Sequence, residues 1–443
     1  MKVLVVGGGA REHAIAEALK RSPQQVELYS AMSNANPGIK RLSVATLRAK
    51  ETDLEAVTEF ALKHGIELAV IGPEAPLCAG LADELLAAGV ACVGPRRAVA
   101  MVECSKEFCR NLMAKYRIPG NLAYATFDDA KEAAEYIDSF PGDVAVKPVG
   151  LTGGKGVRVV GEQLRDREDA KAYAREVIER GIGGGRVVIE ERALGEEFTV
   201  QAFVDGRSVV GMPAVQDHKR AFEGDRGHNT GGMGSYSQKD GLLPFLTQDD
   251  YDFALEVIRK TVGALREETG EEYRGVLYGQ FMKGREIKLI EFNCRFGDPE
   301  AMNVLTLLES DFVEICAGIA EGGLSRKHVN FAKLASVCKY VVPKGYGINP
   351  APPARISVDE EAIRREGAVL YYAAVNEENG EIYTTTSRSV AVVGVAESLA
   401  EAEKIAERAI GHIRGEHIYH RSDIGKRKLI EAKLERLRRL RGE

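Results

Sequence analysis

The first hundred residues alternate short apolar runs with amphipathic segments. The pattern predicts strands at Val3–Val6, Val26–Tyr29, Leu68–Ile71 and Ala91–Gly94, and helices at Glu12–Lys20, Leu54–His64 and Leu81–Ala88. Such alternation is typical of a parallel sheet with helices on both faces. Because ligands bind beyond the carboxyl ends of the strands in these sheets, the loops Gly7–His13 and Gly72–Pro76 are candidate binding loops.

The pattern changes near residue 105. A helix over Lys106–Tyr116 and a break at Pro119 precede strands and glycine-rich turns as far as Gly297, which predicts an α+β region of two lobes. Further along, helix is predicted over Glu300–Gly318, and strands around Ala335–Val342, Gly367–Ala374 and Val390–Val395. The predicted domains are residues 1–103 (α/β, parallel sheet), 104–322 (two lobes, with a mobile lid lobe at about 117–192) and 323–443 (α+β).

Length and composition fit a multidomain globular protein. The 443 residues suffice for about three domains, and 44% of them are hydrophobic. A net charge of -6 argues against a nucleic-acid-binding protein, so we interpret the basic segment Lys426–Arg441 as a solvated terminal helix and not as a nucleic-acid arm. The seven cysteines form no CxxC pair, which predicts buried thiols in a reducing compartment. Without a leader sequence or a membrane-length apolar run, we expect a cytoplasmic protein.

Two glycine-rich loops are candidates for phosphate binding. Gly7 to Gly9 follow a strand, but Glu12 stands where a dinucleotide-binding motif needs glycine. The loop amides and Arg11 favour a phosphate site, with a plain structural turn as the alternative. The segment Lys147–Val157 lacks the spacing of a Walker A motif and is typical of a lid over nucleotide phosphates, although a surface hairpin looks the same.

A third segment, Arg186–Glu197, is an apolar strand that runs into carboxylates. Taken alone, it is most simply a solvated strand end. As a hinge between two lobes, it would offer backbone groups to adenine and a carboxylate to ribose.

The stretch from Arg274 to Glu300 suggests a metal site. Strand alternation places Glu291 and Asn293 on one face, and a two-residue hairpin loop at 283–284 or 284–285 would put Gln280 on that face too. Three oxygen ligands suit magnesium or manganese held together with ATP phosphates. The alternative is a polar solvent face on which Glu291 pairs with a cation.

Charged side chains beside glycine-rich loops indicate an anionic substrate. Gln216–Arg220 precedes the loop Asn229–Gly234, and such a combination is poor core material. Arg295 follows Asn293 on the same strand parity and could neutralise a phosphate. Alternatively, it pairs with Asp298 or Glu300 to hold the turn.

Several of these sequence motifs occur together, and in this order, in one enzyme family. They are Gly9–Ala14, Gly72–Leu77, Gln216–Arg220, Asn229–Gly234, Arg295–Glu300 and Arg421–Gly425. The chain resembles the phosphoribosylamine–glycine ligases of the ATP-grasp superfamily over nearly its whole length. Ala10 and Thr152-Gly153 depart from the family pattern, and the glycine implies a somewhat more flexible lid.

The resemblance implies a pre-ATP-grasp domain, a two-lobed ATP-grasp unit and a C-terminal domain like that of biotin carboxylase relatives. It implies ATP-dependent ligation of glycine to 5-phosphoribosylamine through glycyl phosphate, with Mg²⁺ or Mn²⁺, in purine biosynthesis. The implied nucleotide-binding residues are Lys106, Lys147, Gly153, Gly154, Lys155, Gly156, Glu190, Glu191, Ala193 and Glu197, and the metal ligands are Gln280, Glu291 and Asn293. Catalysis would fall to Arg295, Lys219 and Asp217, and substrate binding to Gly9, Arg11, Glu74 and Asp298.

Two other functions remain as alternatives. Another ATP-grasp ligase, such as a carboxylase, would share the lid and metal strand but lack the phrases at 217–220 and 295–300. A nucleotide-binding protein without catalysis would have damaged metal ligands, whereas Gln280, Glu291 and Asn293 are intact. The sequence leaves the oligomeric state open, with a monomer as the simplest expectation, and predicts small-molecule partners without nucleic acid or membrane.

Overall fold

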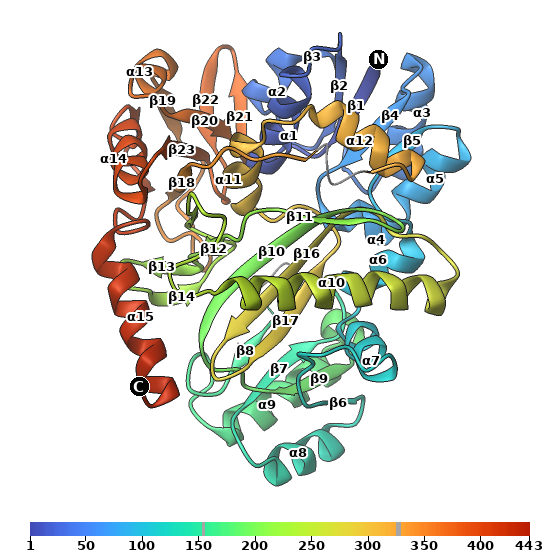
Figure 1. Ribbon diagram of the computed structural model, residues 1–443, viewed down its shortest axis with the longest axis vertical. Helices are drawn as coiled ribbons and strands as arrows, with labels where there is room; N and C mark the ends of the chain where they lie inside the picture. The colour runs from blue at the N-terminus through green and yellow to red at the C-terminus, as the bar shows by residue number, and fades with distance from the viewer. Residues whose placement is uncertain (153–155, 325–328) are drawn as a thin grey trace.

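The computed structural model describes residues 1–152, 156–324 and 329–443. Its N-terminal region is a five-stranded parallel sheet in the order β3-β2-β1-β4-β5 (Figure 1). The strands are β1 (Lys2–Val6), β2 (Glu27–Met32), β3 (Ser43–Arg48), β4 (Leu68–Ile71) and β5 (Ala91–Val93), and the helices include α1 (Ala10–Lys20), α3 (Leu54–His64) and α5 (Leu81–Ala87). The predicted α/β fold of this region is confirmed.

The sequence pattern did not predict some of the short helices and strands. In β3 the side chains alternate between half-buried and exposed, so the strand has no continuous apolar run. Helices α2 (Pro37–Leu42), α4 (Glu74–Ala79) and α6 (Arg97–Cys104) are too short for a clear helical period.

The cysteine prediction was wrong for one pair. Cys78 on α4 and Cys104 at the end of α6 form a disulfide, because the packing of these helices brings their Cα atoms to 5.8 Å. The described free thiols, at Cys92, Cys109, Cys294, Cys316 and Cys338, are all buried as expected.

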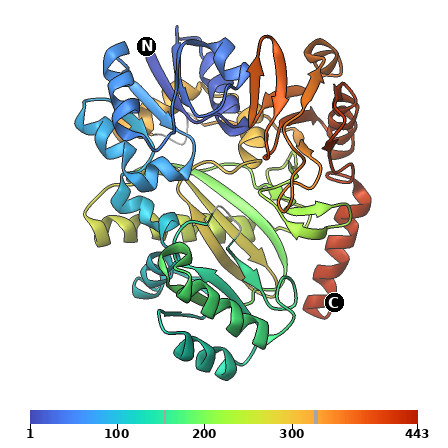
Figure 2. The ribbon, with the colours of Figure 1, turned by 180° about the vertical axis from the view of Figure 1, so that it is seen from behind.

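Residues 124–191 build a small lobe with its own core, which we call the lid lobe. Its antiparallel sheet has the order β6-β9-β7-β8, with β6 (Tyr124–Phe127), β7 (Val144–Pro148), β8 (Arg158–Val159) and β9 (Val187–Glu191). Helices α8 (Ala130–Ser139) and α9 (Arg167–Glu179) pack on each other, and α9 packs on β7. Figure 2 shows the lid lobe as a separate body below the rest of the molecule.

The larger lobe is an antiparallel sheet in the order β11-β10-β16-β17. It consists of β10 (Glu196–Asp205), β11 (Val209–Gly211), β16 (Arg274–Lys283) and β17 (Ile287–Asn293), with the 22-residue helix α10 (Gln248–Thr269) packed on it. Helix α7 (Lys106–Lys115) lies between this lobe and the lid lobe (Figure 1).

The C-terminal sheet has the order β12-β15-β18-β23-β20, and β25 (Ile418–Tyr419) also pairs with β18. It contains β12 (Gln216–Asp217), β15 (Gly234–Ser237), β18 (Ala335–Pro343), β20 (Val369–Tyr372) and β23 (Val390–Ala396), and α14 (Leu399–Ile410) covers it. Two of its strands, β12 and β15, therefore precede the predicted boundary at residue 322. The long helix predicted at Glu300–Gly318 is two helices, α11 (Glu300–Leu307) and α12 (Phe312–Glu321).

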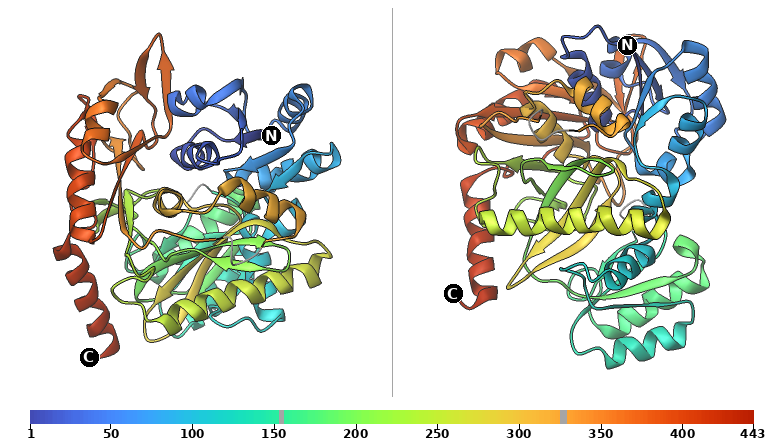
Figure 3. Two further views of the ribbon diagram at one scale, coloured as in Figure 1. Left: turned by 45° about the horizontal axis from the view of Figure 1, so that its top comes forward. Right: turned by 45° about the vertical axis from the view of Figure 1, so that its right-hand side comes forward.

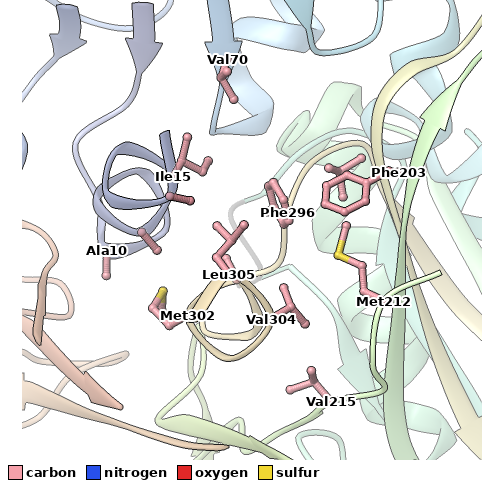
Figure 4. Close-up of a cluster of buried hydrophobic side chains, with 14 of the residues drawn as sticks. Ala10, Ile15, Val70, Phe203, Met212, Val215, Phe296, Met302, Val304 and Leu305 are labelled. Atoms are coloured by element: carbon pink, nitrogen blue, oxygen red, sulfur yellow. The ribbon is translucent and has the colours of Figure 1, made fainter. Parts of the chain in front are cut away.

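One continuous core joins the N-terminal sheet, the larger lobe and the C-terminal sheet. Figure 4 shows part of it, where side chains from α1, α11, β4 and β10 point toward one another. The lid lobe keeps a separate core, which comprises twelve buried residues of the described part of the lobe. Among the described residues, no helix combines the length and apolar character needed to cross a bilayer.

The basic terminal helix α15 (Arg427–Arg441) runs along the outside of the molecule (Figure 3). It is less solvated than predicted, because Leu429, Ile430, Lys433 and Leu437 are buried. Its Lys433 lies 3.5 Å from Glu196 at the start of β10. Part of its positive charge is thus paired with carboxylates of this same chain.

Candidate active site

The hairpin of β16 and β17 forms one wall of the candidate site. Its loop has three residues, 284–286, with Lys283 opposite Ile287, so the predicted two-residue loop was wrong. A three-residue loop alone would put Ile290 opposite Gln280. A β-bulge shifts the register by one residue, so that Glu291 faces Gln280 and Asn293 faces Tyr278.

The bulge gathers oxygen ligands on one face. Gln280 donates to Glu197 on the neighbouring β10 (Nε2 to Oε2, 2.7 Å), and Asn293 lies beside Glu291 (Nδ2 to Oε1, 3.5 Å). Lys219 pairs with Glu197 at 3.3 Å. The face therefore carries two carboxylates and two amides next to a cation.

Lysines surround this face. Burial by itself would raise the pKa of Glu291, but the ammonium groups of Lys219, Lys147 and Lys106 lower it overall. Burial by itself would lower the pKa of Lys219, but the carboxylates of Glu197 and Glu291 raise it overall. Burial lowers the pKa of Lys106, with Lys147 adding to the effect. This concentration of positive charge suits a polyphosphate.

The opposite wall comes from the lid lobe. Lys147 at the end of β7 pairs with Glu190 on β9 (Nζ to Oε2, 2.6 Å), and Arg110 on α7 donates to the other oxygen of Glu190 (Nε to Oε1, 2.7 Å). Burial alone would raise the pKa of Glu190, but the two cations lower it to about 2. Its carboxylate is therefore ionised and engaged within the protein.

The remaining predicted nucleotide residues lie around this wall. Glu191 ends β9, 3.7 Å from Lys288, and Ala193 lies half-buried in the segment that joins β9 to β10. Gly156 accepts a hydrogen bond from Tyr173 (2.8 Å), and a Cβ at Gly156 would lie 2.4 Å from the hydroxyl of Thr152. Gly153, Gly154 and Lys155 lie outside the described residues.

The N-terminal domain contributes a second charged cluster. Gly9 caps α1 and donates to Glu12 (2.7 Å), and Arg11 donates to Glu12 (2.6 Å) and to the carbonyl of Phe296 (3.1 Å). Burial would raise the pKa of Glu74, but Arg295 and Arg11 lower it to about 2. These predicted substrate residues thus meet the loop that follows β17.

Arg295 joins the two clusters. Its guanidinium lies 3.3 Å from Glu74 and 3.1 Å from Glu103 at the end of α6, and it sits over the ring of Tyr278. The suggested pairing with Asp298 or Glu300 was wrong, because helices α4 and α6 bring their own carboxylates to this loop. Glu103 also accepts from the amide of Cys294 (2.7 Å).

The far side of the candidate site carries three acidic residues, Asp217, Asp298 and Glu300. Asp298 accepts from Tyr340 (2.5 Å) and lies 3.3 Å from Arg388, while Tyr278 donates to Glu300 (2.9 Å). Burial, together with the Glu300 carboxylate, raises the pKa of Asp217 well above its ordinary value. Among the described residues, no group donates to Oδ1 of Asp217. On this side of the site, the backbone amides of Thr230 and Met233 donate to the backbone carbonyls of Lys219 and His218, respectively.

Sequence reasoning missed Arg110, Glu103 and Arg388. Each is a single charged residue in a helix or loop without a recognisable motif, and such residues are usually exposed to solvent. The one available signal was position: Arg110 lies four residues after Lys106 and so on the same side of α7.

The donor set fits a hard cation shared with phosphates. No group of three His, Cys, Asp or Glu that could hold a metal occurs in the described ranges. Glu291 supplies one carboxylate, and the flanking amides of Gln280 and Asn293 can each present an oxygen when the amide is turned. Few protein ligands and several open positions are what magnesium prefers beside a nucleotide.

Comparison with known proteins covers all three regions. Residues 1–103, 104–301 and 336–427 match the models of the N domain, the ATP-grasp (A) domain and the C domain of phosphoribosylglycinamide synthetase. A phosphoribosylamine–glycine ligase from Methanocaldococcus jannaschii is 55% identical, with both chains covered in full.

Solved structures agree with these matches. The crystal structure of the phosphoribosylamine–glycine ligase from Thermotoga maritima has a TM-score of 0.81 at 28% identity, covering 96% of this chain and 100% of that one. A biotin carboxylase from Campylobacter jejuni has a TM-score of 0.72 at 14% identity, covering 98% of this chain and 95% of that one. The latter likeness extends to the fold alone.

Proposed function

This chain belongs to the phosphoribosylamine–glycine ligase family and is an ATP-dependent ligase that joins glycine to phosphoribosylamine, and from this premise we propose how its residues divide the work. The observation that carries the proposal is the register of β16 and β17, which sets Gln280, Glu291 and Asn293 beside Glu197 and three lysines. ATP lies between this face and the lid lobe.

The lid wall and α7 hold the nucleotide. We assign Lys106, Lys147 and Lys155 to the phosphates, and Gly153, Gly154 and Gly156 to the same part of the nucleotide. The chain from Glu190 through Glu191 to Ala193 offers backbone groups to adenine, because the Glu190 carboxylate is already engaged by Lys147 and Arg110. Glu197 takes the ribose hydroxyls.

Gln280, Glu291 and Asn293 hold Mg²⁺ or Mn²⁺. When bound, the cation would neutralise charge on the β- and γ-phosphates. The protein's part is to keep Glu291 ionised, which its neighbouring lysines do by lowering its pKa.

The ligation needs two displacements. In the first, a carboxylate oxygen of glycine attacks the γ-phosphorus of ATP, so that ADP leaves and glycyl phosphate forms. In the second, the amine of phosphoribosylamine attacks the carbonyl carbon, phosphate leaves with the C–O bond electrons, and the amine loses a proton. Positioning and charge neutralisation suffice for both, so no covalent protein intermediate is required.

Lys219, Arg295 and Asp217 serve these displacements. Lys219 and Arg295 neutralise developing negative charge. Asp217, whose buried Oδ1 has no hydrogen-bond donor among the described residues, binds the amine. Gly9, Arg11, Glu74 and Asp298 hold phosphoribosylamine where the N-terminal domain meets the loop after β17. We further propose a monomer acting in the cytoplasm on these small molecules alone.

The proposal is tested by ADP release from purified protein with glycine, with and without freshly generated phosphoribosylamine. Turnover should require both substrates, because glycyl phosphate is kept from water until the amine arrives. Equal turnover with alanine or bicarbonate in place of glycine would favour a different ATP-grasp ligase.

A further inference from the structure

The β-bulge in β17 decides which of its side chains share a face with Gln280. In a regular strand Leu289 and Glu291 would share a face. The bulge separates them: Leu289 pairs with Phe281 and is fully buried, whereas Glu291 pairs with Gln280. Without it, Ile290 would take the place of the carboxylate.

Arg110 binds the backbone at this bulge. Its NH1 donates to the carbonyl of Leu289 (3.1 Å), and its NH2 donates to the carbonyl of Ile290 (2.7 Å). A bulge removes regular ladder partners from the residues around it, and buried carbonyls need replacement donors. The guanidinium supplies them on both sides of the register shift.

The same guanidinium reaches the lid wall. Its Nε donates to Glu190 (2.7 Å), which in turn holds Lys147, and its NH1 donates to Asn121 (3.2 Å). Arg110 is only 2% exposed. A planar fork of donors can hold β17, β9 and residue 121 at once, whereas an ammonium group of the same charge has no such geometry.

We propose that Arg110 is a positioning residue that fixes the bulge of β17 and so directs Glu291 and Asn293 toward the metal and ATP. This inference rests on the proposed metal role of Glu291. In this role Arg110 acts through the backbone of Leu289 and Ile290, to whose carbonyls it donates, and not by binding substrate or metal.

The experiment compares Arg110→Lys with a matched control, Arg167→Lys. Arg167 also donates to backbone carbonyls, those of Asp138 (3.0 Å) and Phe140 (2.7 Å), but on the outer side of the lid lobe. In metal-free protein, amide hydrogen exchange of residues 287–293 should accelerate in Arg110→Lys and stay unchanged in Arg167→Lys. Calorimetric Mn²⁺ affinity in the presence of ADP should fall by about tenfold or more in Arg110→Lys only.

A double-mutant cycle separates this role from the metal assignment. Because Arg110 affects metal binding mainly through the placement of the Glu291 carboxylate, Arg110→Lys should weaken Mn²⁺ binding by less than about threefold in a Glu291→Gln background. The positioning role is overturned if Arg110→Lys weakens Mn²⁺ binding equally in the wild-type and Glu291→Gln backgrounds. It is also overturned if Glu291→Gln weakens Mn²⁺ binding while Arg110→Lys binds Mn²⁺ with wild-type affinity. Wild-type affinity in Glu291→Gln instead overturns the metal assignment and this inference with it.

If Arg110→Lys does not fold, Asn121→Ala decides the question. It removes one acceptor of the guanidinium while leaving the charge in place. Faster exchange at residues 287–293 supports the inference, and unchanged exchange overturns it.

Discussion

The lid lobe and the rest of the molecule differ in how their side chains are buried. The lid lobe has its own hydrophobic core, whereas the N-terminal sheet, the larger lobe and the C-terminal sheet share one core. The candidate site takes side chains from both, so one part of it belongs to a small unit with its own core and the other to a large continuous body. This difference suggests a division of labour, in which the body fixes the ligands for metal and substrates and the lid supplies adjustable contacts to ATP.

Polar contacts, not a shared core, connect the two regions. Arg110 holds Glu190, the amide of Lys106 donates to the carbonyl of Val149 (3.0 Å), and Arg220 of the body pairs with Glu162 of the lid. Such contacts can be broken one at a time without emptying a core. Variants in each wall should therefore separate loss of chemistry from loss of lid closure.

The largest effect on turnover is expected for a variant of β17, on the body side of the site. Glu291→Gln removes the one formal charge among the proposed metal ligands and should lower turnover by at least about 10³-fold with little change in melting temperature. The control is Glu286→Gln, an exposed residue of the same hairpin that pairs only with Lys288 in the described structure. An active Glu291→Gln variant with unchanged magnesium dependence would contradict the assignment.

The next effect concerns the contact between the body wall and the N-terminal domain. Arg295→Lys keeps a positive charge but cannot reach both Glu74 and Glu103 as a planar fork. We expect turnover to fall by about 10²-fold or more, with a much smaller loss of ATP affinity. Melting temperature and turnover measured on one preparation check this. An unstable variant with normal activity per folded molecule would restrict Arg295 to a structural role.

The separate cores give a third comparison. Ile137→Ala empties a buried site in the lid lobe and should cost about 2–5 kcal/mol of local stability, whereas Ile258→Ala makes a similar hole beneath the body sheet. Ile137→Ala should speed amide exchange across residues 124–191 and lower turnover at limiting ATP by about tenfold, with the body unchanged. Coincident unfolding of both regions in Ile137→Ala would show that the lid is not an independent unit.

The two regions also differ in what the sequence could predict. The parallel sheet of the N-terminal domain follows from the alternation of apolar runs with amphipathic segments, because β1, β2, β4 and β5 are mostly buried, whereas β3 is not. The face that carries Gln280, Glu291 and Asn293 was predicted correctly in spite of a wrong loop length. The three-residue loop and the bulge at Ile290 each shift the register by one residue, and the two shifts compensate.

Partners distant in sequence were beyond prediction. Nothing local to Arg295 indicates that helices α4 and α6 will bring Glu74 and Glu103 to it. Likewise, Arg110 lies 180 residues from the carbonyl of Ile290 that it binds. The disulfide between Cys78 and Cys104 has the same origin, because only the packing of two helices brings these thiols together.

The smallest effect is expected at the ion pair between Glu162 of the lid and Arg220 of the body. Both side chains are about 30% exposed, at 31% and 27%, so the pair should contribute less than about 1 kcal/mol. Since this pair joins the lid lobe to the body, Glu162→Gln should raise the KM for ATP by about two- to threefold and leave kcat unchanged, and the difference should vanish in high salt. Glu176→Gln is the control, because Glu176 pairs with Arg180 and Arg158 inside the lid lobe. If Glu162 acts only through Arg220, adding Arg220→Gln to Glu162→Gln should change the KM no further. A further rise in the double variant would mean that Arg220 affects the KM independently of Glu162, and an equal rise in Glu176→Gln would mean that lid stability and not lid closure sets the KM.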